Sequence, residues 1–331
     1  MLSIVSFARR WAPITLLGAL AAGCSTSGIS SANFSASGPD AGRSVAQNRM
    51  LAQGHGPHSQ NTRSQSKGWI SPDHRHKGRV GLIYWGNYDS STITIFNSKG
   101  VNGKERGQIT AGLSNPERLF VDKHGSVYAT NIGNNTITAY KHGQTSPFIT
   151  ISNGVNLPTG ITVDAAGTIY CANVGNNTIT VYPKGQTSPS LTIPYFAEYL
   201  ATDAHDNLYA AGSAVEEFAP GSSNGKDLGL PRYPGALEVD RSGNLIVLYG
   251  SSVEYFPAGQ TTPSKQITVE GSPFALSLSA NEKQLFVSTE VSIPFVIESV
   301  AYPNGTAFTT KLTGGAGEWP IAVSPDNALG G

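Results

Sequence analysis

TNIGNNTITAYKHGQTSP, residues 130–147, is followed 42 residues later by ANVGNNTITVYPKGQTSP, residues 172–189. At least twelve of these eighteen positions are identical. Partial copies begin at Trp85 and Tyr249. A repeat of about 40 residues is typical of proteins in which each unit packs against its neighbours. We therefore expect one structural unit to recur along most of the chain.

A second pattern precedes each copy. It consists of proline, two residues, an apolar–x–apolar triplet, aspartate, a turn and a second apolar strand. It occurs at residues 116–128, 158–170, 197–209, 234–246 and 273–286, with Ala197 in place of proline and Ser279 in place of aspartate. The aspartate is expected to cap its own turn. The recurring asparagines Asn87, Asn131 and Asn173 are expected to tie adjacent loops together.

Each unit divides into four short strands. In the third unit these are residues 160–164, 168–173, 178–182 and 190–193. Ile179 and Val181 alternate with Thr178, Thr180 and Tyr182, so both faces of the strand are partly apolar, as in a sheet that packs between two others. Four strands in about 40 residues is the β-propeller period.

Counting units predicts six blades. The first unit, residues 82–109, has three strands and lacks the innermost one. Residues 319–326, WPIAVSPD, match that missing strand. A C-terminal strand that completes the N-terminal blade would close the ring and remove its open edges.

With these repeats, residues 80–331 resemble the six-bladed NHL-repeat propellers. They are related in pattern to the senescence-marker/gluconolactonase group and the streptogramin lyases. The resemblance implies an all-β fold, a six-bladed β-propeller of four-stranded blades. Because this scaffold carries hydrolases, lyases and binding modules alike, the resemblance implies no single activity.

The N-terminus predicts export. Arg9 and Arg10 precede an apolar run that ends at Gly23, and this run is too short to span a bilayer, which takes about 20 residues. Residues 20–24, LAAGC, resemble the lipobox of bacterial lipoproteins. This implies that residues 1–23 are a signal peptide and that Cys24 is the lipid attachment site. Ser25 after that cysteine implies the outer membrane in a diderm host. Cys171 then has no disulfide partner and is expected to be a small buried side chain.

Residues 24–79 predict a disordered, basic tether, because they have no sustained apolar periodicity. The whole chain has 22 basic and 22 acidic residues, but residues 1–79 hold nine basic and two acidic ones. The remaining residues therefore carry 13 basic and 20 acidic side chains. A negatively charged propeller argues against a nucleic-acid partner.

Candidate binding residues gather at one face of the expected ring, which we call the mouth. It is formed by the loops before the inner strands and the turns between the second and third strands. Aromatic and arginine side chains dominate interface energetics. The candidate contact residues for a ligand are Trp85, Arg118, Arg232, Tyr233, Phe274 and Trp319.

The leading hypothesis is a monomeric, lipid-anchored propeller of the cell envelope. It would bind a protein, glycan or small ligand at its mouth and perform no catalysis. One alternative is a lactone or ester hydrolase of the gluconolactonase type. It would use calcium or another divalent cation, for which the weak candidate ligands are Glu117, Asn156 and Glu198. A second alternative is a structural envelope component. No nucleophile elbow or phosphate-binding loop occurs in the sequence.

Overall fold

The computed structural model describes residues 68–70, 81–97, 104–279, 281–291, 295–314 and 318–323, and the side chains of all of these except 69–70 and 318–319. The residues of the expected signal peptide, Cys24 and most of the expected tether lie outside this part of the chain. The described residues belong to one compact unit, Ala41–Gly331. They form strands and turns only. Within them, no helix has the length and apolar character needed to cross a membrane.

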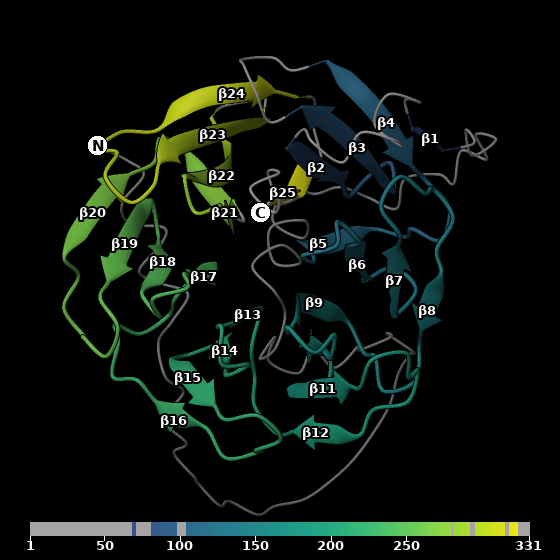
Figure 1. The fold of residues 1–331 in the computed structure, drawn as a ribbon, viewed down its shortest axis with the longest axis horizontal. Coiled ribbons are helices and arrows are strands. Elements are labelled where there is room, and N and C mark those ends of the chain that lie inside the picture. Colours follow the sequence, from purple (N-terminus) through teal and green to yellow (C-terminus); the bar gives the residue numbers. More distant parts are fainter. Residues whose placement is uncertain are drawn as a thin grey trace, which may run out of the picture. The chain divides into compact units, whose positions relative to one another are not determined.

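Six antiparallel sheets, the blades, are arranged in a ring (Figure 1). Blade 1 contains β2 (Leu82–Asn87), β3 (Thr92–Asn97), β4 (Glu105–Ile109), β25 (Glu318–Val323) and β1 (Trp69–Ile70). Blade 2 contains β5 (Pro116–Val121), β6 (Val127–Asn131), β7 (Thr136–Tyr140) and β8 (Ile149–Ile151), and blade 3 contains β9 (Pro158–Val163), β10 (Ile169–Asn173), β11 (Thr178–Tyr182) and β12 (Leu191–Ile193). Blade 4 contains β13 (Tyr199–Thr202), β14 (Leu208–Ala211), β15 (Val215–Phe218) and β16 (Lys226–Asp227). Blade 5 contains β17 (Leu237–Val239), β18 (Leu245–Tyr249), β19 (Ser252–Phe256) and β20 (Lys265–Thr268), and blade 6 contains β21 (Ser272–Leu278), β22 (Gln284–Glu290), β23 (Phe295–Ala301) and β24 (Thr309–Thr313). The expected six-bladed β-propeller is confirmed.

The C-terminal strand closes the ring, as expected. In Figure 1 the yellow β25 lies beside the dark blue β2. The two strands pair antiparallel, with Ile83 opposite Val323 and Trp85 opposite Ile321. The inner edge of blade 1 is therefore covered by the other end of the chain.

The outer edge of blade 1 differs from the expectation. Trp69 and Ile70, which the sequence assigned to a disordered tether, form strand β1 and pair with Gln108 and Gly107 of β4. The prediction of a structureless segment is wrong at these two residues. A two-residue strand is held by backbone hydrogen bonds, which leave no repeating side-chain pattern in the sequence.

The hydrophobic core lies between neighbouring blades rather than at one centre. Ile179 and Val181 pack with Leu208 and Phe218 of blade 4. Tyr182, on the opposite face of the same strand, packs with residues of blade 2. Each sheet is thus buried on both faces, which confirms the two partly apolar faces expected from the sequence.

The repeated polar residues stabilise turns. Asp122 accepts hydrogen bonds from the backbone N–H groups of His124 and Ser126 at 2.9 and 2.8 Å. Asp203 and Asp240 cap their turns in the same way, as expected.

The recurring asparagines join one loop to the next. The side-chain oxygens of Asn131 and Asn173 accept from the backbone N–H groups of Ser114 and Asn156. Cys171 is fully buried, and burial raises the pKa of its thiol well above the ordinary value. It is a core residue, as expected.

Candidate functional site

The mouth end of each inner strand has one equivalent position that differs between blades. From blade 1 to blade 6 the residues there are Trp319, Glu117, Thr159, Glu198, Gly235 and Phe274. In blades 2, 3 and 6 a β-bulge interrupts the pairing of the inner strand at this point. A bulge redirects the side chain of the extra residue. The repeat therefore imposes a backbone geometry here but no residue type.

Glu117 occupies this position in blade 2 and is only 1% exposed. Neither of its carboxylate oxygens has a hydrogen-bond partner. The nearest charge partner is Arg118, whose Nη1 lies 3.7 Å from Oε1 of Glu117. Burial raises the pKa of Glu117 to about 7, because the opposing effect of Arg118 is smaller and Glu198 adds to the rise. This carboxyl group therefore changes charge near neutral pH.

Arg118 crosses from blade 2 towards blade 4. Its Nη1 donates to the carbonyl oxygen of Glu117 at 2.8 Å, and its guanidinium carbon lies 4.4 Å from the centre of the Tyr199 ring. Its side chain is 13% exposed, and its Nε is buried without a hydrogen-bond partner. The pKa of Arg118 is raised although burial alone lowers it, because Tyr199, Glu117 and Glu198 stabilise the cation. A cation over an aromatic face is attracted by the ring quadrupole.

Blade 3 lies between these two blades and carries small residues there. Gly160 stands at the position of Arg118, and a Cβ atom at Gly160 would lie 2.9 Å from the carbonyl oxygen of Glu198. Thr159 is fully buried, and its hydroxyl has no hydrogen-bond partner. We refer to Glu117, Arg118, Thr159, Glu198 and Tyr199 as the mouth cluster.

Two members of the mouth cluster, Thr159 and Tyr199, were not among the residues expected from the sequence. The sequence does distinguish Tyr199 from the rest of the repeat, because the equivalent residues of blades 3, 5 and 6 are small: Gly160, Ala236 and Ala275. A large aromatic residue at a position that is otherwise small marks a departure from the repeat. Burial raises the pKa of the Tyr199 hydroxyl to about 12, so this group stays protonated at physiological pH.

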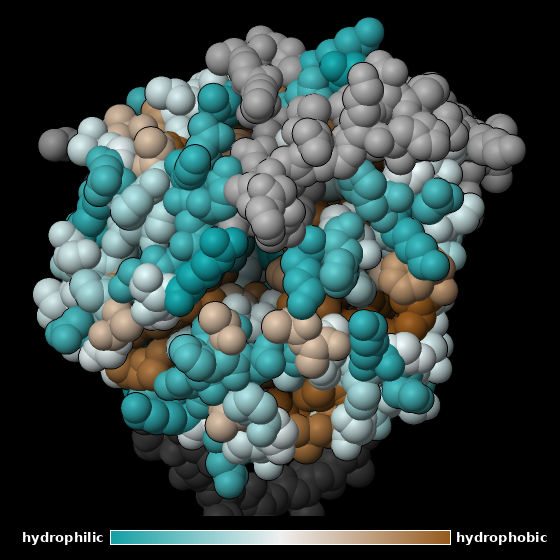
Figure 2. Space-filling model, in the orientation of Figure 1, coloured by the Kyte–Doolittle hydropathy of each residue, from teal (hydrophilic) through white to brown (hydrophobic). Residues whose placement is uncertain are grey.

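A further carboxyl group lies on the inner strand of blade 5. Glu238 is half-buried, and burial raises its pKa to about 8, although the backbone N–H of Leu278 on blade 6 opposes the rise. Figure 2 shows one face of the ring, where hydrophilic side chains border a hollow near the centre. The inner strands thus contribute two carboxyl groups of raised pKa, Glu117 and Glu238, that the repeat does not require.

The structure does not bring the expected contact residues together. Trp85 and Phe274 are buried in the core between blades 6 and 1, so they offer no exposed contact area, and that part of the prediction is wrong. Arg232 pairs with Asp227, on the outermost strand of blade 4, at 2.8 Å. Tyr233 is exposed, while the side chain of Trp319 lies outside the described part of the chain.

The weak candidate metal ligands fit a metal poorly. Glu117 and Glu198 influence one another, but Arg118 supplies a fixed positive charge to both. Asn156 packs its side chain against Gly175 of its own blade. Among the described residues, no group of three or more His, Cys, Asp or Glu side chains could hold a metal ion.

Comparisons with known proteins identify a shared fold. No family model and no curated protein matches this sequence. A chain from the crystal structure of the nidogen/laminin complex matches with a TM-score of 0.57 and 18% identity, over 74% of this chain and 99% of that one. A functionally unknown protein from Desulfotomaculum acetoxidans DSM 771 matches with a TM-score of 0.55 and 13% identity, over 76% of this chain and 100% of that one. At these identities the likeness establishes the architecture alone, and the chain is a six-bladed β-propeller.

Proposed function

We propose that this propeller is a binding module that holds its ligand at the mouth cluster. The observation that supports this most strongly is the buried carboxyl group of Glu117, whose two oxygens have no hydrogen-bond partner. Leaving a buried polar group unsatisfied costs about 1–3 kcal/mol, and more for a charged one. Such a group stays in a fold most readily when a ligand satisfies it.

The propeller itself does not need this carboxylate. Blades 3, 5 and 6 fold with threonine, glycine and phenylalanine at the equivalent position. Arg118 is also imperfectly paired, because its Nε has no partner. The polar cluster therefore destabilises the fold without a structural reason, which is typical of functional sites.

The charges of the cluster favour a ligand that brings N–H donors. Two carboxyl groups, Glu117 and Glu198, face one guanidinium, and that guanidinium already interacts with the Tyr199 ring. A basic side chain of a protein or an amino group of a glycan or small molecule would bring N–H donors to the two oxygens of Glu117 that have no hydrogen-bond partner. The fold is also found in a chain of the nidogen/laminin complex, so an architecture of this type occurs in a protein assembly.

We place this module among the NHL-type propellers and in the cell envelope. Its repeats support the first proposal, and the lipobox-like residues before Cys24 support the second. The anchored module would act as a monomer, attached to the membrane through the lipid on Cys24. Radiolabelled palmitate incorporation that is lost in Cys24→Ala tests the anchor.

Binding at the mouth is tested by comparing two variants of the full chain with a matched control on peptide and glycan arrays. Glu117→Gln removes the charge with little change in shape, and Arg118→Met removes the guanidinium. Arg241→Met removes an exposed arginine in the β17–β18 turn, on the face of the ring opposite the mouth. We expect an amine-bearing ligand that binds wild type and Arg241→Met equally and binds both cluster variants at least about tenfold more weakly. Equal binding by all four proteins would overturn the proposal.

The metal-dependent hydrolase is separated from this proposal by a second measurement. A metal that occupies its site at 100 times its dissociation constant adds about 2.7 kcal/mol to the free energy of unfolding. Because the donor set is poor, we expect the melting temperature to be the same in EDTA, Ca²⁺, Mg²⁺ and Zn²⁺. A metal-dependent rise that Glu117→Gln abolishes would favour the hydrolase.

A further inference from the structure

A second candidate site lies between blades 5 and 6, on the face of the ring opposite the mouth. The cavity there has a volume of about 390 Å³. It is formed by the turns β17–β18, β19–β20 and β23–β24 and by the ends of their strands. A volume of this size is within the range of small-molecule sites, which is about 300–1,000 Å³. We call it the blade 5–6 pocket.

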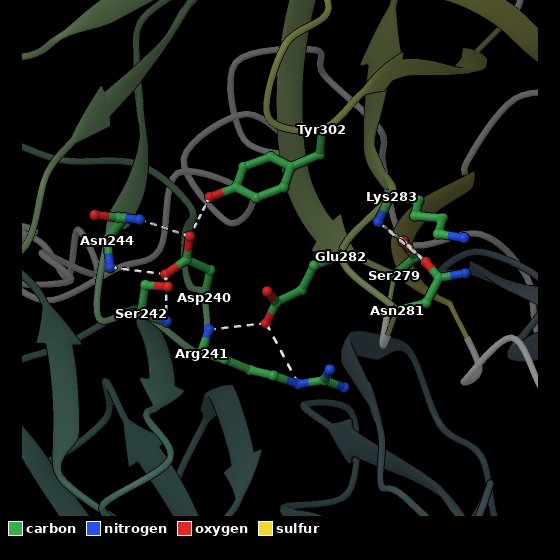
Figure 3. Close-up of polar contacts among 9 residues, drawn as sticks. All are labelled: Asp240, Arg241, Ser242, Asn244, Ser279, Asn281, Glu282, Lys283 and Tyr302. Atoms are coloured by element: carbon green, nitrogen blue, oxygen red, sulfur yellow. Dashed lines mark hydrogen bonds and ion pairs between the residues drawn. The ribbon is translucent and has the colours of Figure 1, made fainter. Parts of the chain in front are cut away.

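One wall of the pocket is held by hydrogen bonds between the two blades (Figure 3). The hydroxyl of Tyr302, on blade 6, donates to Asp240 Oδ2, on blade 5, at 2.6 Å. The same oxygen accepts from the side chain of Asn244 at 2.8 Å. Nearby, the Arg241 side chain forms an ion pair with Glu282 at 3.6 Å, and its backbone N–H donates to the same carboxylate. Asp240 is therefore fully engaged, and the pocket is pre-organised.

Lys265 brings a positive charge into this pocket without a matching negative one. Its Nζ donates to the carbonyl oxygen of Pro303 at 2.6 Å and lies 4.6 Å from the centre of the Tyr255 ring. No carboxylate of the described residues forms an ion pair with it. Partial burial lowers the pKa of Lys265, so the folded protein does not fully compensate the charge. Two of its three N–H donors are left for another acceptor.

Tyr255 adds a second unsatisfied group. It is 6% exposed and its hydroxyl has no hydrogen-bond partner. Its ring stacks on Tyr302, with centroids 6.0 Å apart and an interplanar angle of 29°. Phe256 and Pro257 supply apolar surface in the same pocket. The hydroxyl oxygen itself is buried, so the pocket offers one cation and apolar walls.

We propose that the blade 5–6 pocket binds a small organic acid, with Lys265 holding its carboxylate and the aromatic and proline side chains contacting its carbon skeleton. A carboxylate carries one charge and accepts two hydrogen bonds, which matches one ammonium with two N–H donors left. A phosphate carries nearly two charges and would require a second cation or a row of backbone N–H groups. The pocket is independent of the mouth cluster and could be occupied whether or not the mouth binds a ligand.

The test uses the full-length protein and benzoate, an acid with a flat apolar body, followed by saturation-transfer NMR and calorimetry. Benzamide, which has nearly the same shape but no charge, is the matched control ligand. We expect benzoate to bind at millimolar concentration and benzamide to bind at least about tenfold more weakly, because a hydrogen bond to a charged group contributes about 1.5–3 kcal/mol.

Three variants assign the binding to this pocket. Lys265→Met should weaken benzoate binding at least about tenfold, and Tyr255→Phe, which removes only the buried hydroxyl and keeps the ring, should leave it unchanged. Lys184→Met, at an exposed lysine in the corresponding turn of blade 3, should leave it unchanged. The proposal fails if wild type does not bind benzoate, if benzamide binds as well, or if Lys265→Met binds like wild type. Circular dichroism spectra and melting curves confirm that each variant is folded.

Discussion

The guanidinium of Arg118, on blade 2, lies 4.4 Å from the centre of the Tyr199 ring, on blade 4. The contact passes over blade 3, where the equivalent residue is Gly160 and offers no side chain. Neighbouring blades of a propeller normally contact each other through their sheet faces. Here a single side chain contacts a blade that is not a neighbour of its own. The repeat does not specify this contact.

Glu117→Gln should make the protein more stable above neutral pH. The folded pKa of Glu117, about 7, is above its ordinary value of 4.5, so the folded protein holds this proton more tightly than the unfolded chain. The contribution of this group to stability is complete below about pH 4.5 and is lost as the pH rises to about 7. Glutamine stays neutral at every pH. The free energy of unfolding of the variant, relative to that of wild type, should therefore rise by on the order of 3 kcal/mol between about pH 4.5 and about pH 7. Urea unfolding from pH 4 to 9 measures the difference. Glu105→Gln, at an exposed carboxylate of β4, is the control, and a Glu117→Gln difference that does not change with pH would contradict the prediction.

Arg118→Met should destabilise the protein by about 3–5 kcal/mol above pH 7, because it removes the cation beside the buried carboxylate of Glu117. The loss should be smaller below pH 5, where Glu117 is protonated. Arg232→Met removes a guanidinium that pairs with Asp227 at the surface, and such pairs contribute about 0–1 kcal/mol. Thermal unfolding of the two variants at pH 5 and pH 8 checks both statements. Similar losses in the two variants would show that the mouth cluster is not a special site.

Tyr302→Phe should destabilise the protein by about 1–3 kcal/mol. It removes the 2.6 Å hydrogen bond that joins blade 6 to Asp240 of blade 5. Tyr255→Phe removes a hydroxyl that has no partner, so stability should be unchanged or slightly higher. The two variants lose the same atom, a tyrosine hydroxyl oxygen. Chemical denaturation measures the free energy of unfolding of each, and so compares a hydroxyl that forms a hydrogen bond with one that does not. The opposite order of stability would be inconsistent with the structure.

Asn173→Ala should destabilise the protein by about 2–3 kcal/mol. The buried amide accepts from the backbone N–H of Asn156 and donates to the Thr180 hydroxyl, both at 3.0 Å. Its removal leaves both partners unsatisfied. Asn153→Ala, at an exposed position whose amide contacts only Ser188 in the hydrogen bonds of the described residues, should stay within about 0.5 kcal/mol of wild type. Melting temperatures of the two variants provide the measurement.

Truncation after residue 317 should prevent stable folding. It removes β25, so the edge of β2 that pairs with β25 in the closed ring becomes exposed. An open, apolar strand edge promotes aggregation. Truncation after residue 323 retains β25 and should fold. Sedimentation and circular dichroism distinguish the two proteins, and a soluble, cooperatively melting protein that ends at residue 317 would refute the role of β25.

Several features could be predicted because the repeat specifies them locally. The hydrogen bonds with which the aspartates cap their turns, and those of Asn131 and Asn173, lie within one blade, so these roles follow from short sequence spacings. The missing inner strand of blade 1 was recognisable because residues 319–326 resemble the inner strands of the other units. Trp85 and Phe274 were predicted at the mouth because they lie near strand ends. Packing between blades 6 and 1 buries both, and strand position alone does not reveal that.

The amino-acid sequence by itself determined the period, the number of blades, the closure of the ring and the turn chemistry, since each follows from a residue pattern that recurs in every unit, and the C-terminal residues match the inner-strand part of that pattern. Only the tertiary structure decided that Glu117, Arg118 and Tyr199 form one cluster, and that Lys265 and Tyr255 share a pocket with Tyr302 of the next blade. The physical reason is that these contacts depend on how far a side chain reaches across neighbouring blades, on what the intervening residue leaves open, and on which polar atoms are left without a partner.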